Sequence, residues 1–172
     1  MMKKQILIYL SLLLCVSPLQ ARGTYQEPAA FLNETFKTEL PQAKVIWLTG
    51  ETGKTVEKIL QHKPSQLRIR YWLKEQRSAW ILEEVGKDEL ITVGIVINNN
   101  KIERVKVLIF RESRGDEIRH DFFTQQFKQA TIQADSQLDR SIDGISGATM
   151  SVRALTKLSR MALFLSSQIK QP

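Results

Sequence analysis

Cysteine and histidine are scarce in this chain, and their scarcity removes several kinds of chemistry. Cys15 is the only cysteine, and His62 and His120 are the only histidines. If Cys15 is removed with an N-terminal leader, neither a disulfide framework nor a thiolate metal site can form. The two histidines lie far apart with no paired ligand spacing, so we expect no metal site. If such a chain carries out redox chemistry, that chemistry must come from a bound cofactor, since no thiol remains.

Residues 1–21 have the pattern of a secretory signal peptide. Lys3 and Lys4 precede an apolar run over residues 5–16, and Ala21 offers a cleavage point. The run is shorter than the roughly 20 apolar residues that a membrane span needs. We therefore expect an exported protein, periplasmic or on the outer face of the inner membrane, with residues 22–172 as a single domain.

Two alternatives to a cleaved signal stay open. The leader could be retained as an anchor, or Cys15 could be lipidated. Leu14 stands directly before Cys15, where a lipoprotein signal has a small residue, and this disfavours lipidation.

The positive charge of the chain is dispersed. The formal net charge is +7 and falls to +5 when Lys3 and Lys4 leave with the leader. The basic residues do not form the dense stripe, interleaved with aromatics, that nucleic-acid binding requires. We expect no nucleic-acid partner, although a mildly basic face could meet anionic lipid or an acidic redox partner.

The segment Gly50–Thr55 (GETGKT) must be tested as a phosphate-binding loop, since it lies between an expected strand and an expected helix. That motif requires a glycine five positions before Gly53, and Leu48 stands there. We therefore interpret the segment as an ordinary turn, with a helix over residues 55–61.

Apolar periodicity predicts one α+β domain with a mostly antiparallel sheet and a long C-terminal helix packed on one face. Asn98-Asn99-Asn100 predicts a hairpin. Residues 27–40 form an expected helix. The expected strands cover residues 43–49, 67–73, 79–85, 90–97 and 101–110. The last helix carries an apolar stripe at spacings of three and four, made of Val152, Leu155, Leu158, Ala162, Leu165 and Ile169.

The segment before that last helix, residues 143–151, reads Asp-Gly-Ile-Ser-Gly-Ala-Thr-Met-Ser. It sets the hydroxyl of Thr149 at a helix start, and the small Gly147 and Ala148 leave room for another molecule. Free N–H groups and the helix dipole favour an anion such as phosphate there. Ser and Thr also cap helices, so an ordinary capping turn is the alternative.

Asp143, Ser146, Gly147, Ala148 and Thr149 resemble the Asp-x-x-(Ser/Thr)-Gly-Ala-Thr signature of the FMN-binding domain family. This domain occurs in the flavin subunits of sodium-pumping NADH:quinone reductase and Rnf-type complexes and in stand-alone exported proteins. The resemblance implies that Thr149 is esterified to the phosphate of FMN by a magnesium-dependent flavin transferase that uses FAD as donor. Residues 143–148 would then form the sequence that the transferase recognises, with Met150 and Ser151 beside the cofactor.

The resemblance extends upstream over residues 91–127, and Glu112-Ser113-Arg114-Gly115 is similar to the family's Glu-(Thr/Ser)-x-Gly loop. Arg114 stands where many members have proline. The resemblance implies that Glu112 and Gly115 line the rim of a flavin ring, and an exposed charged loop is the alternative. Residues 24–85 resemble nothing known to us.

Four aromatic residues in the expected strands could stack on a flavin, although such residues more often pack in the core. They are Trp47, Trp72, Trp80 and Tyr71.

Three functions follow from this pattern. The first is an electron carrier whose covalent FMN serves a membrane-bound redox partner, quinone-linked or haem-containing. The second is a flavin-dependent reductase of a small molecule, and the third is a flavin-free binding module of the same fold. We find no converging set of ionisable residues for a reductase, so we expect an electron-transfer protein with no catalytic residues of its own.

Overall fold

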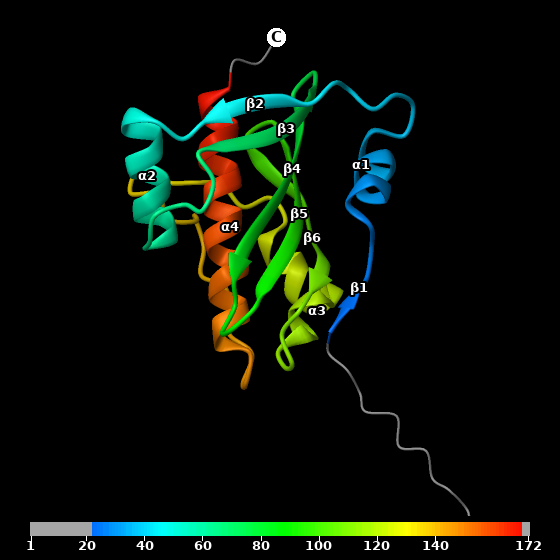
Figure 1. Ribbon diagram of the computed structural model, residues 1–172, viewed down its shortest axis with the longest axis vertical. Helices are drawn as coiled ribbons and strands as arrows, with labels where there is room; N and C mark the ends of the chain where they lie inside the picture. Colours follow the sequence, from blue (N-terminus) through cyan, green and yellow to red (C-terminus); the bar gives the residue numbers. More distant parts are fainter. Residues whose placement is uncertain (1–21, 170–172) are drawn as a thin grey trace, which may run out of the picture.

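The fold is α+β, as the sequence predicts. A computed structural model describes residues 22–169; the expected signal peptide (1–21) and Cys15 lie outside the described residues. Its centre is a six-stranded antiparallel sheet in the order β1-β6-β5-β4-β3-β2, and α4 crosses one face of it (Figure 1). No helix within residues 22–169 combines the length and the apolar character that crossing a bilayer requires.

The elements follow one another with short connections, apart from a long segment before α4. In chain order they are β1 (Gly23–Thr24), α1 (Pro28–Phe36), β2 (Lys44–Trp47), α2 (Gly50–Leu60), β3 (Arg68–Lys74), β4 (Arg77–Val85), β5 (Leu90–Asn98), β6 (Lys101–Phe110), η1 (Asp116–Arg119), α3 (Asp121–Thr124), η2 (Gln125–Phe127) and α4 (Thr149–Gln168).

The main core lies between the sheet and α4. Strand residues alternate between the two faces, so that Trp80 and Leu82 of β4 join this core. The predicted apolar stripe of α4 is buried along its length, and α2 packs against α4 from the side. The N-terminal end of α4 lies at one end of the molecule, away from β2 (Figure 1), and Thr149 is the first residue of this helix.

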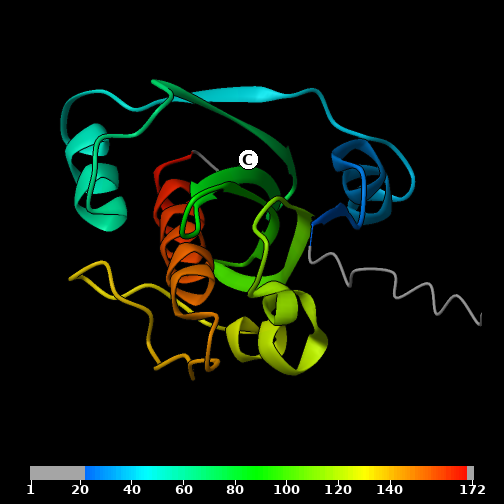
Figure 2. The same ribbon diagram turned by 60° about the horizontal axis from the view of Figure 1, so that its bottom comes forward.

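A second, smaller core covers the opposite face of the sheet. Helix α1 lies on the side of the sheet opposite α4 (Figure 2), and its Phe31, Leu32 and Phe36 form the smaller core with Ala79, Val96 and Leu108 of the strands. Phe31 lies over Gly94 of β5 so closely that a β-carbon added there would approach the Phe31 ring to 2.6 Å. The missing side chain of Gly94 is therefore what admits the ring.

The predicted hairpin at residues 98–100 is confirmed. Asn99 and Asn100 both have positive φ, of 51° and 59°, which asparagine tolerates better than most residues. The sharp turn between β3 and β4 also needs a positive φ, and Glu75 adopts 53° there. Nothing in the residue type of Glu75 marks such a turn.

Two expected boundaries were wrong, and one strand was not expected. The helix expected over residues 27–40 ends at Phe36, because Lys37 turns to a φ of 47°. The helix expected to begin at residue 55 begins at Gly50 instead. Gly50 to Gly53, interpreted as part of a turn, form its first turn, and the Gly53 N–H donates to Thr49 O at 3.2 Å. Strand β1 is two residues long and was not expected, since so short a strand has no periodicity.

Substituting alanine for Gly94 tests the packing between α1 and the sheet. The new methyl group would overlap the Phe31 ring, and overpacking of this kind costs about 1–3 kcal/mol. We expect Gly94→Ala to lower the free energy of unfolding by that amount in urea denaturation. Gly144→Ala is the matched control, because nothing lies within 4 Å of a β-carbon there. Equal stabilities of the two variants would contradict the close packing.

Candidate functional site

The chain enters α4 through a tight turn built on the predicted motif. Ala148 N–H donates to Ile145 O at 3.0 Å, which closes a turn with Ser146 and Gly147 at its centre. Gly147 has a φ of 83°, a left-handed conformation that favours glycine. Ser146 and Gly147 are both exposed. The glycine of the motif is therefore required by the backbone of this turn.

Thr149 is the first residue of α4. The first helical hydrogen bond runs from Val152 N–H to Ala148 O at 2.9 Å, so the three preceding N–H groups, of residues 149–151, have no acceptor within the helix. These N–H groups and the helix dipole make the position favourable for an anion.

The side chain of Thr149 is available for chemistry. Thr149 is exposed, and its hydroxyl makes no hydrogen bond with any of residues 22–169. The N-cap residue is Ala148, and no side chain caps the helix. The alternative in which Ser146 or Thr149 serves as a capping residue is therefore not what the structure shows.

Asp143 lies exposed in the segment that leads to the turn. Its N–H donates to Gln126 Oε1 at 2.7 Å, and this bond ties the segment to η2. Its carboxylate makes no ion pair within the described part of the chain. Asp143 thus presents an exposed carboxylate without an ion-pair partner among the described residues, six positions before Thr149 in the chain. A second protein could contact this carboxylate. The role of Gln126 had no signal in the sequence.

The two predicted motifs, which are distant in the sequence, meet in the structure. Gly115 has a φ of 89°, and a β-carbon there would lie 2.8 Å from Ser151 Oγ and 3.3 Å from Ala148 Cβ. Ala148 and Ser151 are buried against this loop, with 2% and 4% of their surface exposed. Gly115 therefore supports the first turn of α4 from beneath, on the side away from solvent.

Glu112 holds the same loop to the hairpin between β4 and β5. Its Oε1 accepts the N–H groups of residues 87, 88 and 89 at 2.5, 2.7 and 2.9 Å. A β-carbon at Gly86 would lie 2.7 Å from this oxygen, so only glycine leaves room for it. Burial raises the pKa of the Glu112 carboxyl, but the three N–H bonds and the Lys87 charge outweigh burial and lower it. The carboxylate has a supporting role, and its contact with a cofactor stays a prediction.

Most of the aromatic residues considered for stacking belong to the cores. Trp80 is fully buried and stacks on Tyr71 with 5.1 Å between ring centroids. Trp72 packs against the smaller core beside α1. Trp47 is 57% exposed but lies on β2, and β2 and the N-terminal end of α4 are at opposite ends of the molecule (Figure 1).

A groove of about 670 Å³ runs along α4 from Val152, three residues beyond Thr149, to Arg160. It follows the helix face that carries Thr149, because Arg153, Thr156 and Arg160 recur at helical spacing from that residue. The apolar side chains of Ile142 and Val152 also line it. The cations along the groove are Arg140, Arg153, Lys157 and Arg160. A groove of this charge suits an anionic or electron-rich planar group.

Met150 follows Thr149 in the first turn of α4. It is 43% exposed, and its sulfur is 3.8 Å from Arg153 Nη1. Two arginines of the loop and helix after β6 differ in their ion pairs. Arg119 pairs with Asp116, whereas Arg114 has no ion pair with any described residue. The exposed end of α4 thus combines a free hydroxyl, unpaired N–H groups and positive charge.

One comparison with known proteins identified a family. Residues 86–163 match the family model described as the FMN-binding domain. The matched range includes both predicted motifs and all of β5, β6 and the first three-quarters of α4. The comparisons with curated proteins and with solved structures found no match.

Glu112→Gln tests the anchoring of the loop under α4. A neutral amide accepts the three N–H groups less strongly than a carboxylate does, so we expect a loss of about 1–3 kcal/mol of stability at pH 7. The pKa of Glu112 is lowered in the folded state, so its contribution is present above the ordinary value of 4.5 and is lost as pH falls through the folded-state pKa. The stability difference between the two proteins should therefore shrink on acidification.

Urea unfolding at pH 7 and pH 3 measures this effect, with the exposed Glu117→Gln as the matched control. A difference between wild type and Glu112→Gln that does not change with pH would contradict the carboxylate's role.

Proposed function

Because residues 86–163 match the model of the FMN-binding domain, we propose that this protein is an exported electron carrier with FMN esterified to Thr149. FMN binding follows from the family. The covalent bond, the export and the redox partner are the parts that we propose.

The observation that carries the proposal is the state of the Thr149 hydroxyl. An acceptor for a phosphoester bond must be reachable by a transferase and must not be tied to the protein's own structure. Thr149 meets both conditions, since it is exposed and its hydroxyl has no hydrogen bond to residues 22–169. Ser151, the nearest other hydroxyl in the first turn, is 4% exposed and meets Gly115 instead.

The first turn of α4 would stabilise the phosphate once it is attached. The N–H groups of residues 149–151 point away from the helix body without helical partners, and the positive end of the helix dipole adds to their effect. Ala148 contributes no side chain that could compete for these groups. The backbone thus supplies the anion site, and the hydroxyl supplies the covalent bond.

In the proposed attachment, FAD donates its FMN half to Thr149. The Thr149 oxygen attacks the FMN phosphorus of FAD, the bond between the two phosphates breaks, and AMP leaves; the hydroxyl proton is lost. The transferase must activate the hydroxyl, since no residue of this chain donates to it or accepts from it within the described range. Asp143 and the exposed turn at Ser146 and Gly147 are the features that the transferase would recognise.

Bound FMN supplies the ability to accept and release electrons, and the chain supplies attachment and electrostatics. The groove that follows α4 from Val152 onward offers an apolar surface at Ile142 and Val152 together with four cations. Positive charge beside a flavin favours its reduced form. A covalent tether would keep the cofactor on the protein outside the cytoplasm, where no free pool replaces it.

Thr149→Ala tests the attachment directly. We expect protein produced with its flavin transferase to carry one added FMN, less one water, that survives denaturation, and the alanine variant to carry none. Thr149→Ser should retain some attachment, because it keeps the hydroxyl. The matched control is Thr156→Ala, which removes a hydroxyl bonded to Val152 O on the same helix. Flavin that remains covalently bound to Thr149→Ala would contradict the proposal.

Asp143→Asn tests recognition by the transferase. The carboxylate makes no ion pair with residues 22–169, so its removal should leave the thermal unfolding temperature unchanged. We expect slower flavin incorporation, measured as yellow colour in denatured protein sampled over time with purified transferase and FAD. Asp135→Asn, an exposed acid elsewhere on the surface, is the control. Equal incorporation rates for the two variants would show that Asp143 is not recognised.

A further inference from the structure

Strands β3 and β4 pair along only part of their lengths. Tyr71–Lys74 pair with Arg77–Trp80, and beyond Trp80 strand β4 pairs with β5 alone. On the other side, β3 continues by pairing with β2 down to Arg68. The sheet therefore opens into a fork, and the backbone of residues 81–84 has no strand partner on the side of the fork.

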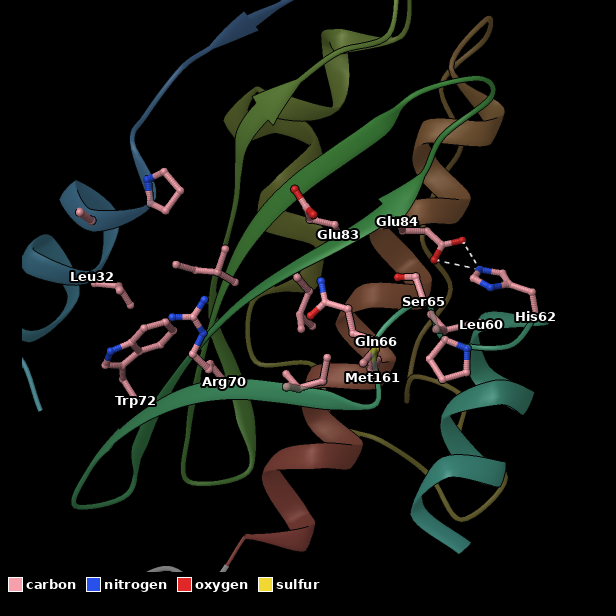
Figure 3. A pocket seen from close by; sticks show the side chains of 16 residues that line it. Leu32, Leu60, His62, Ser65, Gln66, Arg70, Trp72, Glu83, Glu84 and Met161 are labelled. Carbon is pink, nitrogen blue, oxygen red and sulfur yellow. Dashed lines mark hydrogen bonds and ion pairs between the residues drawn. The ribbon is translucent and has the colours of Figure 1, made fainter. Parts of the chain in front are cut away.

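A cavity of about 380 Å³ occupies this fork (Figure 3). It is lined from both faces of the sheet, since α1 contributes Leu32 and α4 contributes Met161. The segment of residues 64–66 forms a further wall. The apolar side chains around it are Leu32, Leu60, Ile69, Ile81, Leu82 and Met161.

At one end of the cavity two basic side chains share the carboxylate of Glu84. His62 Nε2 lies 2.8 Å from Glu84 Oε1 (Figure 3). Lys157 Nζ lies 3.5 Å from the same oxygen. The other ring nitrogen of His62 faces Lys63 O at 2.8 Å, so both nitrogens meet acceptors, and the hydrogen bonds to Lys63 O and to Glu84 raise the pKa of the imidazole. The nearby Glu83 accepts from Thr92 Oγ1 at 2.6 Å and pairs with Arg111 at 3.7 Å.

Arg70 lies at the other end, next to Trp72 and facing the cavity (Figure 3). Its guanidinium makes no hydrogen bond or ion pair with any of residues 22–169. Its neighbour across the strand pair is Val45, which supplies no charge. Among the charged residues that line the cavity, it is the one without a partner in the described chain.

We propose that this cavity binds a small amphipathic anion, a carboxylate or sulfonate on a flat apolar body. The body would enter the fork between Ile81 and Met161, and the anionic group would pair with Arg70. The unpartnered backbone edge of β4 offers further donors and acceptors to polar atoms of the ligand.

The site is independent of the flavin. Met161 lies 12 residues beyond Thr149 on α4, about 18 Å along the helix axis at 1.5 Å per residue. Apart from Met161, the lining residues all precede residue 86, where the match to the FMN-binding domain begins. The segment without a recognised relative thus builds a site of its own.

Two naphthalene dyes that differ by a sulfonate test the proposal on the full chain. The probes are anilinonaphthalene sulfonate and its neutral analogue N-phenylnaphthylamine, with binding followed by fluorescence titration. We expect the anionic dye to bind one per chain and more tightly than the neutral dye. Arg70→Gln should lower the affinity for the anionic dye about tenfold, as expected for one charged contact. It should leave the affinity for the neutral dye unchanged.

Arg68→Gln is the matched control, because Arg68 shares the strand and face of Arg70 but does not line the cavity. This substitution should leave the affinity for both dyes unchanged. Ile81→Trp should fill the fork and abolish binding of both, with circular dichroism confirming the native fold. Equal losses in Arg68→Gln and Arg70→Gln would overturn the proposal, as would dye binding that survives Ile81→Trp.

Discussion

The position of Thr149 depends on the contact between Gly115 and the first turn of α4. Gly115 leaves no space for a side chain beneath Ala148 and Ser151, and this close approach fixes where the helix begins. Glu112 holds the same loop through three N–H bonds to the hairpin at residues 87–89. One carboxylate and two glycines, Gly86 and Gly115, therefore set the geometry of an exposed hydroxyl that none of them touches.

This arrangement separates structural from chemical roles among the motif residues. Ala148 and Ser151 are buried and hold the helix against the loop, whereas Thr149 and Met150 face outward. Gly147 provides a left-handed turn that brings the chain into the helix without a side-chain cap. The absence of a cap is consistent with the proposed chemistry, because a capping side chain would occupy the N–H groups that a phosphate needs.

The sequence allowed much of this to be predicted, and the failures have physical causes. Long amphipathic elements such as α4 and the strands β4 to β6 were predictable because their apolar residues repeat with a clear period. The start of α2 was missed because Gly50 and Gly53 usually mark turns, yet here they form a helix that packs on α4. The buried role of Glu112 could not be predicted, because its partners are backbone groups more than 20 residues away. The fork between β3 and β4 depends on where pairing stops, which strand propensity does not reveal.

The most direct test of the account is to locate the phosphoester bond within the chain. Trypsin cleaves after Arg140 and Arg153, which releases a peptide with hydroxyls at Ser141, Ser146, Thr149 and Ser151. Fragmentation of this peptide from flavin-loaded protein should find the FMN mass on Thr149 and on no serine. Flavin on Ser146 or Ser151, or an unmodified peptide from protein exposed to active transferase and FAD, would contradict the central claim.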